Sequence, residues 1–144
     1  MNPTKQERPI RVFFSYETAD NDHARKLRRI LSRHFNLRIF THEGLSAAED
    51  WKSKLKSELA QCDIFVVLLS PNSVESDWVL QELGGAWMGD KPILPIVTHS
   101  HVLAKIPLQL RNAQTVNIND LDNPEVINQI LESFEEQITE GNFA

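Results

Sequence analysis

The stretch CDIFVVLLSPNSVESDWVLQEL, residues 62–83, decides the fold. Its apolar run from Ile64 to Leu69 shows no polar alternation, which is typical of a parallel strand that is buried on both faces. Ser76 or Asp77 can cap a helix that runs from Trp78 to about Met88. The stretch therefore predicts a central strand that leads, after a short turn, into a helix.

The alternation of strand and helix extends along the rest of the chain. Four further strands are expected at residues 10–14, 37–40, 92–98 and 115–118. Pro95 lacks an N–H, so we expect irregular strand pairing at its position. Apolar residues at helical spacing mark the helix faces that are expected to point inward: Ala24, Leu27, Ile30, Leu31 and Phe35; Trp51, Leu55 and Leu59; Val79, Leu83, Ala86 and Trp87; and Ile127, Ile130, Leu131, Phe134 and Ile138.

Capping residues also mark the expected ends of the helices. Asp20, Asn21 or Asp22 is expected to cap the first helix. Asn123 and Pro124 are expected to open the last helix, because asparagine caps well and proline fits a first helical turn. Residues 103–110 are expected to form a short, poorly defined helix.

Five strand–helix units of this kind predict an α/β fold. We expect a flavodoxin-like, three-layer α/β/α architecture, in which a five-stranded parallel sheet of order 2-1-3-4-5 carries helices on both faces. The 144 residues suffice for one domain, which we place at residues 9–140, with frayed termini at 1–8 and 141–144.

Composition excludes several classes of function. The net charge of -5 argues against a direct nucleic-acid partner, whose affinity would rest on clustered basic residues. Cys62 is the single cysteine, so the chain cannot form an internal disulfide and a reducing compartment is expected. The N-terminus has no apolar signal core, and the longest apolar run is too short to cross a bilayer. The sequence therefore predicts a cytoplasmic protein without a membrane partner.

The expected strand order alone indicates where a binding site should lie. Ligands of such sheets bind beyond the carboxyl ends of the strands, where the strand order reverses, here between strands one and three. The loops at 15–22 and 71–77 lie there, and the loop at 41–48 can fold over the same edge. A phospho-receiver would need acidic residues at these strand ends, where the chain has Ser15 and Ser70. A flavodoxin-type phosphate cradle is also excluded, because the segment after the first strand is acidic.

One carboxylate stands out at this edge. Glu82 follows Trp78 by four positions, so both side chains project from the same face of a helix, beside its apolar stripe. Two interpretations stay open: a perturbed, functional acid, or a glutamate that reaches solvent from the shoulder of the helix.

The order of the segments resembles that of Toll/interleukin-1 receptor (TIR) domains of the bacterial kind. FFSYETADND resembles their first strand and following loop, and LRIFTHEGLSAAEDW resembles their second strand and BB loop. CDIFVVLLSPNSVESDWVLQEL resembles their most recognisable block, and KPILPIV resembles their fourth strand. The resemblance covers roughly Arg11 to Leu121, and it is specific because the pieces occur together in the expected order.

The resemblance implies an enzyme that cleaves NAD⁺ into nicotinamide and ADP-ribose or a cyclic variant of ADP-ribose. It implies Glu82 as the catalytic residue, NAD⁺ as substrate and no separate cofactor. It further implies head-to-tail association with other TIR domains and a role in bacterial antiphage signalling. The substrate-binding residues that it implies come from four segments: Ser15, Tyr16, Leu45, Ser46, Ala47, Ala48 and Trp78. Tyr16 and Trp78 could instead be ordinary packing residues.

Two features depart from the pattern of the family. Many members carry Pro-Gly where this chain has Ala47-Ala48, and alanine resists a backbone turn that glycine permits. Many also carry a basic residue where this chain has Glu17, and an acid there would weaken attraction for a pyrophosphate. The alternatives to an enzyme are therefore a catalytically silent TIR adaptor and an effector that mimics the TIR domains of a host.

The remaining histidines are weaker candidates for metal or ligand contacts. His99 and His101 would need further converging ligands to hold a metal, so loop residues without a metal are expected. His42 and Glu43, in the BB loop, could touch a ligand or be solvated.

Overall fold

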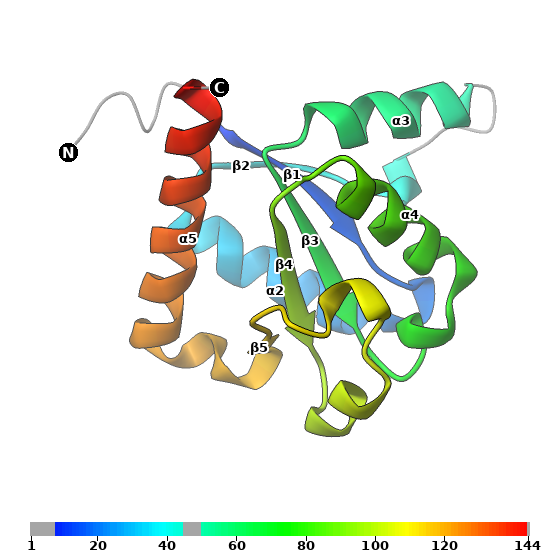
Figure 1. Cartoon of the computed structure of the whole chain (residues 1–144). Helices are drawn as coiled ribbons and strands as arrows, with labels where there is room; N and C mark the ends of the chain where they lie inside the picture. The colour runs from blue at the N-terminus through cyan, green and yellow to red at the C-terminus, as the bar shows by residue number, and fades with distance from the viewer. Residues whose placement is uncertain (1–7, 45–49, 144) are drawn as a thin grey trace.

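The computed structural model describes residues 8–44 and 50–143. Within these residues a parallel sheet has the strand order β2-β1-β3-β4-β5, which confirms the predicted order and fold class (Figure 1). Its strands are β1 (Ile10–Ser15), β2 (Leu37–Phe40), β3 (Ile64–Leu69), β4 (Ile93–Val97) and β5 (Val116–Asn117). The sheet order reverses between β1 and β3, as a flavodoxin-like sheet requires.

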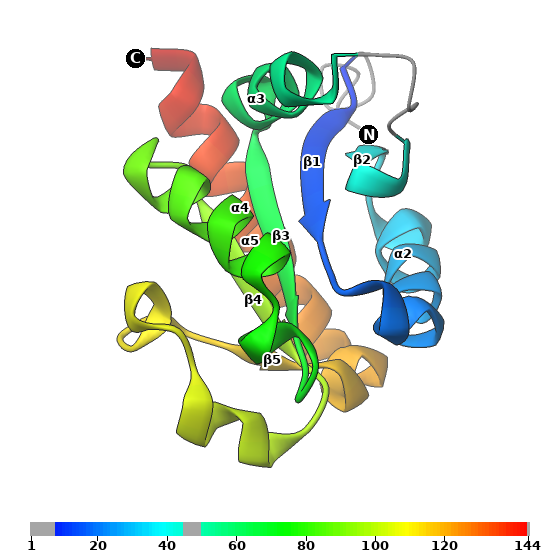
Figure 2. The same ribbon diagram turned by 90° about the vertical axis from the view of Figure 1, so that its right-hand side faces the viewer.

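Helices cover both faces of the sheet (Figures 1 and 2). The α-helices are α2 (Asn21–His34), α3 (Trp51–Gln61), α4 (Asp77–Met88) and α5 (Pro124–Phe143). Short 3₁₀ turns complete the connections: η1 (Thr18–Asp20), η2 (His42–Gly44), η3 (Ser73–Glu75), η4 (Ser100–Lys105), η5 (Leu108–Leu110) and η6 (Ile118–Asp122). None of the helices in the described part of the chain combines the length and the apolar character that crossing a bilayer would need.

The alternation of side chains along the strands separates two cores. Val12 and Phe14 of β1 face α2 and α5, in one buried cluster with Leu27 and Phe134. Phe13, between them, faces the opposite side and packs in a second cluster with residues of α4. Ser15 continues the period of two and therefore points to the α4 side of the sheet. This register brings the end of β1 toward α4.

β3 is the centre of the sheet. All six of its residues are buried, because β1 and β4 flank it and helices cover both of its faces. The predicted fully apolar strand is confirmed, and so is the helix that follows, since the Ser76 hydroxyl accepts a hydrogen bond from the Val79 N–H at the start of α4.

Several predictions for single elements were wrong in detail. Pro95 pairs in regular register with Val67, because its missing N–H faces the β5 side of β4 and not the β3 side. Residues 103–110 form parts of two 3₁₀ turns instead of a helix. The fifth strand is only Val116–Asn117, since η6 begins at Ile118.

Two aromatic residues are less buried than their helical spacing predicted. Trp87 is 52% exposed, because it lies in the last turn of α4 on the shoulder of the buried stripe. Trp51 is 42% exposed, and its ring packs against Trp78 instead of entering the core. The side chains of Leu131 and Ile138 lie outside the described residues.

The cap of α2 also differs from the prediction. Asp20 occupies the capping position, but its carboxylate accepts no hydrogen bond from the N–H groups of the helix. Instead it accepts one from the Ser70 hydroxyl and one from the Asn72 amide, across the sheet edge. At α5, Asn123 accepts from the Glu125 N–H, and Pro124 is the first helical residue, as predicted.

Candidate active site

The candidate site lies at the carboxyl ends of β1 and β3, where the strand order reverses. Ser15 is the last residue of β1 and pairs in register with Val67 of β3. From here the chain leads into η1 on one side and into η3 and α4 on the other. Topology thus brings together two of the three loops that the sequence nominated.

Glu82 is buried one turn into α4 and is 4% exposed. The Ser15 hydroxyl donates a hydrogen bond of 2.6 Å to Glu82 Oε1, which joins residues that are 67 positions apart in the chain. Glu82 Oε2 is buried and has no hydrogen-bond partner among the described residues. One oxygen of the carboxyl group is therefore hydrogen-bonded, while the other oxygen has no hydrogen bond among the described residues.

Burial raises the pKa of Glu82 to about 7, because a low-dielectric surrounding disfavours the charged carboxylate. The Ser15 hydroxyl opposes this rise by donating to the carboxylate. The Trp78 indole N–H also favours the ionised form, although it does not meet the geometry of a hydrogen bond. Of the two interpretations from the sequence, the burial of Glu82 contradicts a glutamate that reaches solvent, while a functional role of the acid stays a prediction.

Aromatic rings form one wall of the site. Trp78 is half-buried and lies between two rings from other elements. Its ring centroid is 5.4 Å from that of His42 in η2 and 5.7 Å from that of Trp51 at the start of α3. Three segments that are far apart in the sequence therefore meet at the residue that precedes Glu82 by one helical turn.

Tyr16 connects the end of β1 with the turn after β2 through a hydrogen bond. Its hydroxyl donates a 2.7 Å hydrogen bond to Glu43 Oε2, and its ring lies 4.9 Å from that of Phe14. Burial, together with the adjacent Glu43 carboxylate, raises the pKa of Tyr16 to about 12. The side chain is 3% exposed, so in this arrangement the ring packs and offers no open face.

A second polar network ties the two nominated loops together. Asp20 is 5% exposed and accepts hydrogen bonds from Ser70 and Asn72, as described above. The Ser70 hydroxyl in turn accepts from the N–H of Ser73, at the start of η3. Because η3 leads into α4, this network fixes the start of the helix that carries Glu82.

The structure thus brings together four of the residues that the resemblance implied: Ser15, Tyr16, Trp78 and Glu82. The other four, Leu45, Ser46, Ala47 and Ala48, lie outside the described residues. Sequence reasoning did not place Trp51 at the site and assigned Asp20 only to a helix cap. The spacing of apolar residues in α3 gave no sign that Trp51 would turn toward α4.

His99, His101 and Cys62 are the remaining candidates from the sequence. The rings of His99 and His101 lie 5.3 Å apart, and His23 lies 6.1 Å from His99. Over residues 8–44 and 50–143, no three metal-ligating side chains converge. Cys62 is buried, and burial raises the pKa of its thiol to about 11, which makes it an inert small residue.

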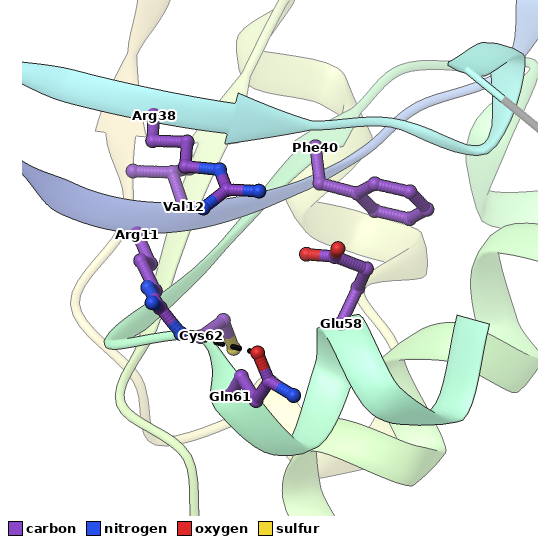
Figure 3. Close-up of a pocket in the computed structure, with 7 residues that line it drawn as sticks. All are labelled: Arg11, Val12, Arg38, Phe40, Glu58, Gln61 and Cys62. Carbon is purple, nitrogen blue, oxygen red and sulfur yellow. Dashed lines mark hydrogen bonds between the residues drawn. The ribbon is translucent and has the colours of Figure 1, made fainter. Parts of the chain in front are cut away.

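A shallow hollow exists elsewhere, between β1, β2 and the end of α3 (Figure 3). Arg11 donates a 3.1 Å hydrogen bond to Gln61 Oε1 at its edge. The residues around it are Arg11, Val12, Arg38, Phe40, Glu58, Gln61 and Cys62. Since Arg11 lies near the start of β1 and Ser15 at its end, the hollow is separate from the candidate site.

Comparison with solved structures shows where this fold recurs. The TIR domain of the Toll-related receptor TRR-2 from Hydra magnipapillata superposes with a TM-score of 0.69 at 16% identity, over 86% of this chain and 97% of that one. The TIR domains of the activated Roq1 resistosome give a TM-score of 0.54 at 16% identity, over 91% and 82%. The CMP N-glycosidase BcmB of Clostridium botulinum gives 0.57 at 14% identity, over 78% and 98%.

These similarities are too distant in sequence to show more than the fold. The fold is thus shared by TIR domains and by an enzyme that cleaves an N-glycosidic bond. A comparison with curated proteins gives no significant match. The family model described as "TIR domain" matches residues 12–131, which is most of the chain. The chain belongs to the TIR domain family.

Proposed function

We propose that this domain is an NAD⁺ glycohydrolase that releases nicotinamide and forms ADP-ribose or a cyclic variant of it, with Glu82 as the catalytic residue. One observation carries the proposal. A buried carboxyl group, held by Ser15 through one oxygen and unpaired at the other, lies where the strand order reverses. Buried acids with a perturbed pKa concentrate at functional sites.

The chemistry suits a single carboxylate. When the N-glycosidic bond of NAD⁺ breaks, the nicotinamide nitrogen takes the bonding electron pair and leaves as a neutral molecule, so no general acid is needed. Positive charge develops on the ribose, and a nearby carboxylate stabilises it. Water then adds to the anomeric carbon and loses a proton, or an internal nucleophile closes a ring. A carboxyl whose pKa is about 7 is also suited to accept that proton near neutral pH.

The neighbouring residues have roles in this proposal. Ser15 orients the carboxylate of Glu82 through the 2.6 Å hydrogen bond. Trp78 contributes to the wall against which the substrate lies. Tyr16 acts through Glu43, by holding the turn that follows β2. The segment 45–48 is proposed to complete substrate binding.

The proposal also covers the setting in which the domain acts. The resemblance to bacterial TIR domains supports a cytoplasmic, bacterial-type member that signals in antiphage defence. Head-to-tail association with other TIR domains would complete the site. The presence of several TIR domains in the activated Roq1 resistosome supports such assembly as a property of the fold.

A second candidate function has an observation in its favour. Glu82 and Tyr16 are almost fully buried in this structure, whereas Trp87 and Met88 are 52% and 75% exposed at the end of α4. Exposed apolar side chains suit contacts with other proteins. A TIR adaptor, or an effector that mimics host TIR domains, would need such a surface and no access to Glu82.

The decisive experiment measures nicotinamide release from NAD⁺ at high protein concentration, with the products resolved by mass. We compare the wild type with Glu82→Gln, which keeps an acceptor for Ser15, and with Glu125→Gln, a matched change on the exposed side of α5. We expect release by the wild type and by Glu125→Gln, and a loss of at least about 100-fold in Glu82→Gln. Equal release by all three proteins would remove Glu82 from catalysis, and no release by any would favour the adaptor.

A further inference from the structure

The described residues contain three buried side-chain polar atoms without a hydrogen-bond partner: His42 Nδ1, Trp78 Nε1 and Glu82 Oε2. Buried polar atoms in folded proteins are nearly always paired, so each exception calls for a physical reason. Here the three exceptions fall in one place. A site that is completed by a ligand would leave this pattern, because the ligand supplies the missing partners.

Contacts among the three residues show that they share one region. Trp78 and Glu82 are one turn apart on the same face of α4, and the Trp78 N–H lies near enough to favour the ionised form of Glu82. The His42 ring meets the Trp78 ring edge to face, with centroids 5.4 Å apart. η2 therefore brings the His42 ring, with its unpaired nitrogen, against the ring of Trp78.

The position of His42 is built into the fold. Its ring lies 5.8 Å from that of Tyr16, and the next residue, Glu43, accepts the hydrogen bond of the Tyr16 hydroxyl. Burial lowers the pKa of His42, while Glu43 and Glu17 act in the opposite direction. The imidazole is therefore neutral at neutral pH, and a neutral imidazole nitrogen can either donate or accept a hydrogen bond.

We propose that His42 is a substrate-contact residue whose Nδ1 bonds to the same sugar group that Glu82 Oε2 and Trp78 Nε1 contact. This inference rests on the proposed function, because it assumes a nucleotide at this site. The unpaired atoms specify the chemistry of the ligand group. Glu82 Oε2 can accept a hydrogen bond from a donor, and the Trp78 N–H can donate one to an acceptor. The adjacent hydroxyls of a ribose supply both, whereas a phosphate supplies acceptors alone and would be repelled by the ionised Glu82.

Two substitutions separate a polar contact from a packing role. His42→Phe keeps a ring against Trp78 but removes the nitrogen, and His42→Asn keeps a polar atom near the position of Nδ1 but removes the ring. His101→Phe, on the exposed turn η4, is the matched control. The readouts are KM and kcat for NAD⁺, and the dissociation constant of ADP-ribose measured by calorimetry.

We expect His42→Phe to raise KM and the ADP-ribose dissociation constant about tenfold, as the loss of one buried hydrogen bond does. His42→Asn should recover most of this loss, and His101→Phe should behave as the wild type. Wild-type affinity in His42→Phe would overturn the inference, and so would an equal loss in His42→Asn, which would indicate ring packing alone. Absence of ADP-ribose binding to the wild type would overturn it as well.

The outcomes also distinguish this inference from the proposed function. If the wild type releases nicotinamide while His42→Phe keeps wild-type KM and affinity, the inference fails and the function stands. If no protein releases nicotinamide, but ADP-ribose binding depends on His42 in the predicted way, the catalytic proposal fails and the contact stands.

Discussion

Glu82 is a single residue whose burial lowers the free energy of unfolding of the domain when its carboxyl group is ionised. Its carboxyl group is buried in a region that supplies one good hydrogen bond and leaves one oxygen unpaired. Such burial has an energetic cost once the group is ionised. A site that is completed by a ligand can carry such a local cost, because the ligand supplies the missing partner. The cost can be measured, because it depends on pH.

The first prediction concerns Glu82→Gln. The pKa of Glu82 is raised from 4.5 to about 7 in the folded protein, so between these values the folded state binds a proton that the unfolded state has lost. Wild-type stability therefore falls as pH rises through this interval. Gln cannot ionise, so the variant should be as stable as the wild type near pH 4 and more stable by up to about 3 kcal/mol at pH 8.

Urea unfolding at the two pH values measures this difference. Glu125→Gln, at an exposed position of α5, controls for the loss of a surface charge. A stability difference that does not grow with pH would contradict the raised pKa.

At this scale the sequence predicted partners within one element and missed those between elements. The spacing of Trp78 and Glu82 nominated the acid, because four positions share a helix face. The contact of Ser15 with Glu82 spans 67 positions and depends on sheet register, which the sequence pattern left undetermined. Asp20 was wrongly assigned as a side-chain cap, because its true partners, Ser70 and Asn72, come from a distant loop.

Among the elements, the packing of α4 against α3 depends on a glycine. A Cβ atom at Gly85 would lie 2.8 Å from Cδ2 of Leu59, which is closer than side chains normally approach. At Gly84 the corresponding space is open, with no atom within 4 Å. The two adjacent glycines of α4 therefore have different roles, although the sequence alone presents them as equivalent.

The second prediction compares Gly84→Ala with Gly85→Ala. Alanine in a helix is favoured over glycine by about 1 kcal/mol, so Gly84→Ala should stabilise the domain by up to that amount. At Gly85 the new methyl group must displace Leu59, so Gly85→Ala should be less stable than Gly84→Ala by about 1 kcal/mol. Thermal or urea unfolding of both variants tests this, and equal stability of the two would refute the close helix approach.

The elements that the sequence described least well are those with few local signals. The strands β1 to β4 are rich in β-branched, aromatic and other apolar residues, and they were predicted within one or two residues. β5 has two paired residues, and the segment before it folds into 3₁₀ turns. Val102 and Leu110 hold that segment by packing into the core, and the sequence shows no periodic pattern of apolar residues that would predict this packing.

On the scale of the whole molecule, the strand order followed from the number and alternation of the elements. Five such units that are joined by right-handed crossovers into one parallel sheet have few alternative topologies. What the sequence could not show is how closed the site is. Glu82 is 4% exposed, and one turn before it the Trp78 ring meets the rings of His42 and Trp51, which come from two other elements.

The third prediction follows from the proposed head-to-tail association. If a neighbouring domain completes the site, activity per protomer depends on the fraction of associated protein. Below the dissociation constant of the assembly, a tenfold rise in protein concentration should then raise the specific activity about tenfold. Nicotinamide release measured over a dilution series, with light scattering at the same concentrations, tests this. A specific activity that does not change with concentration would indicate that a single domain suffices.

The position of Pro95 has a consequence for one edge of the sheet. Its missing N–H faces the β5 side of β4, and β5 pairs only with the two following residues, Ile96 and Val97. An unrelated strand that docked on this edge would find one donor missing from the ladder, beside a strand too short to extend. This edge of the sheet is therefore a poor template for a further strand, and it resists the edge-to-edge pairing that leads to amyloid.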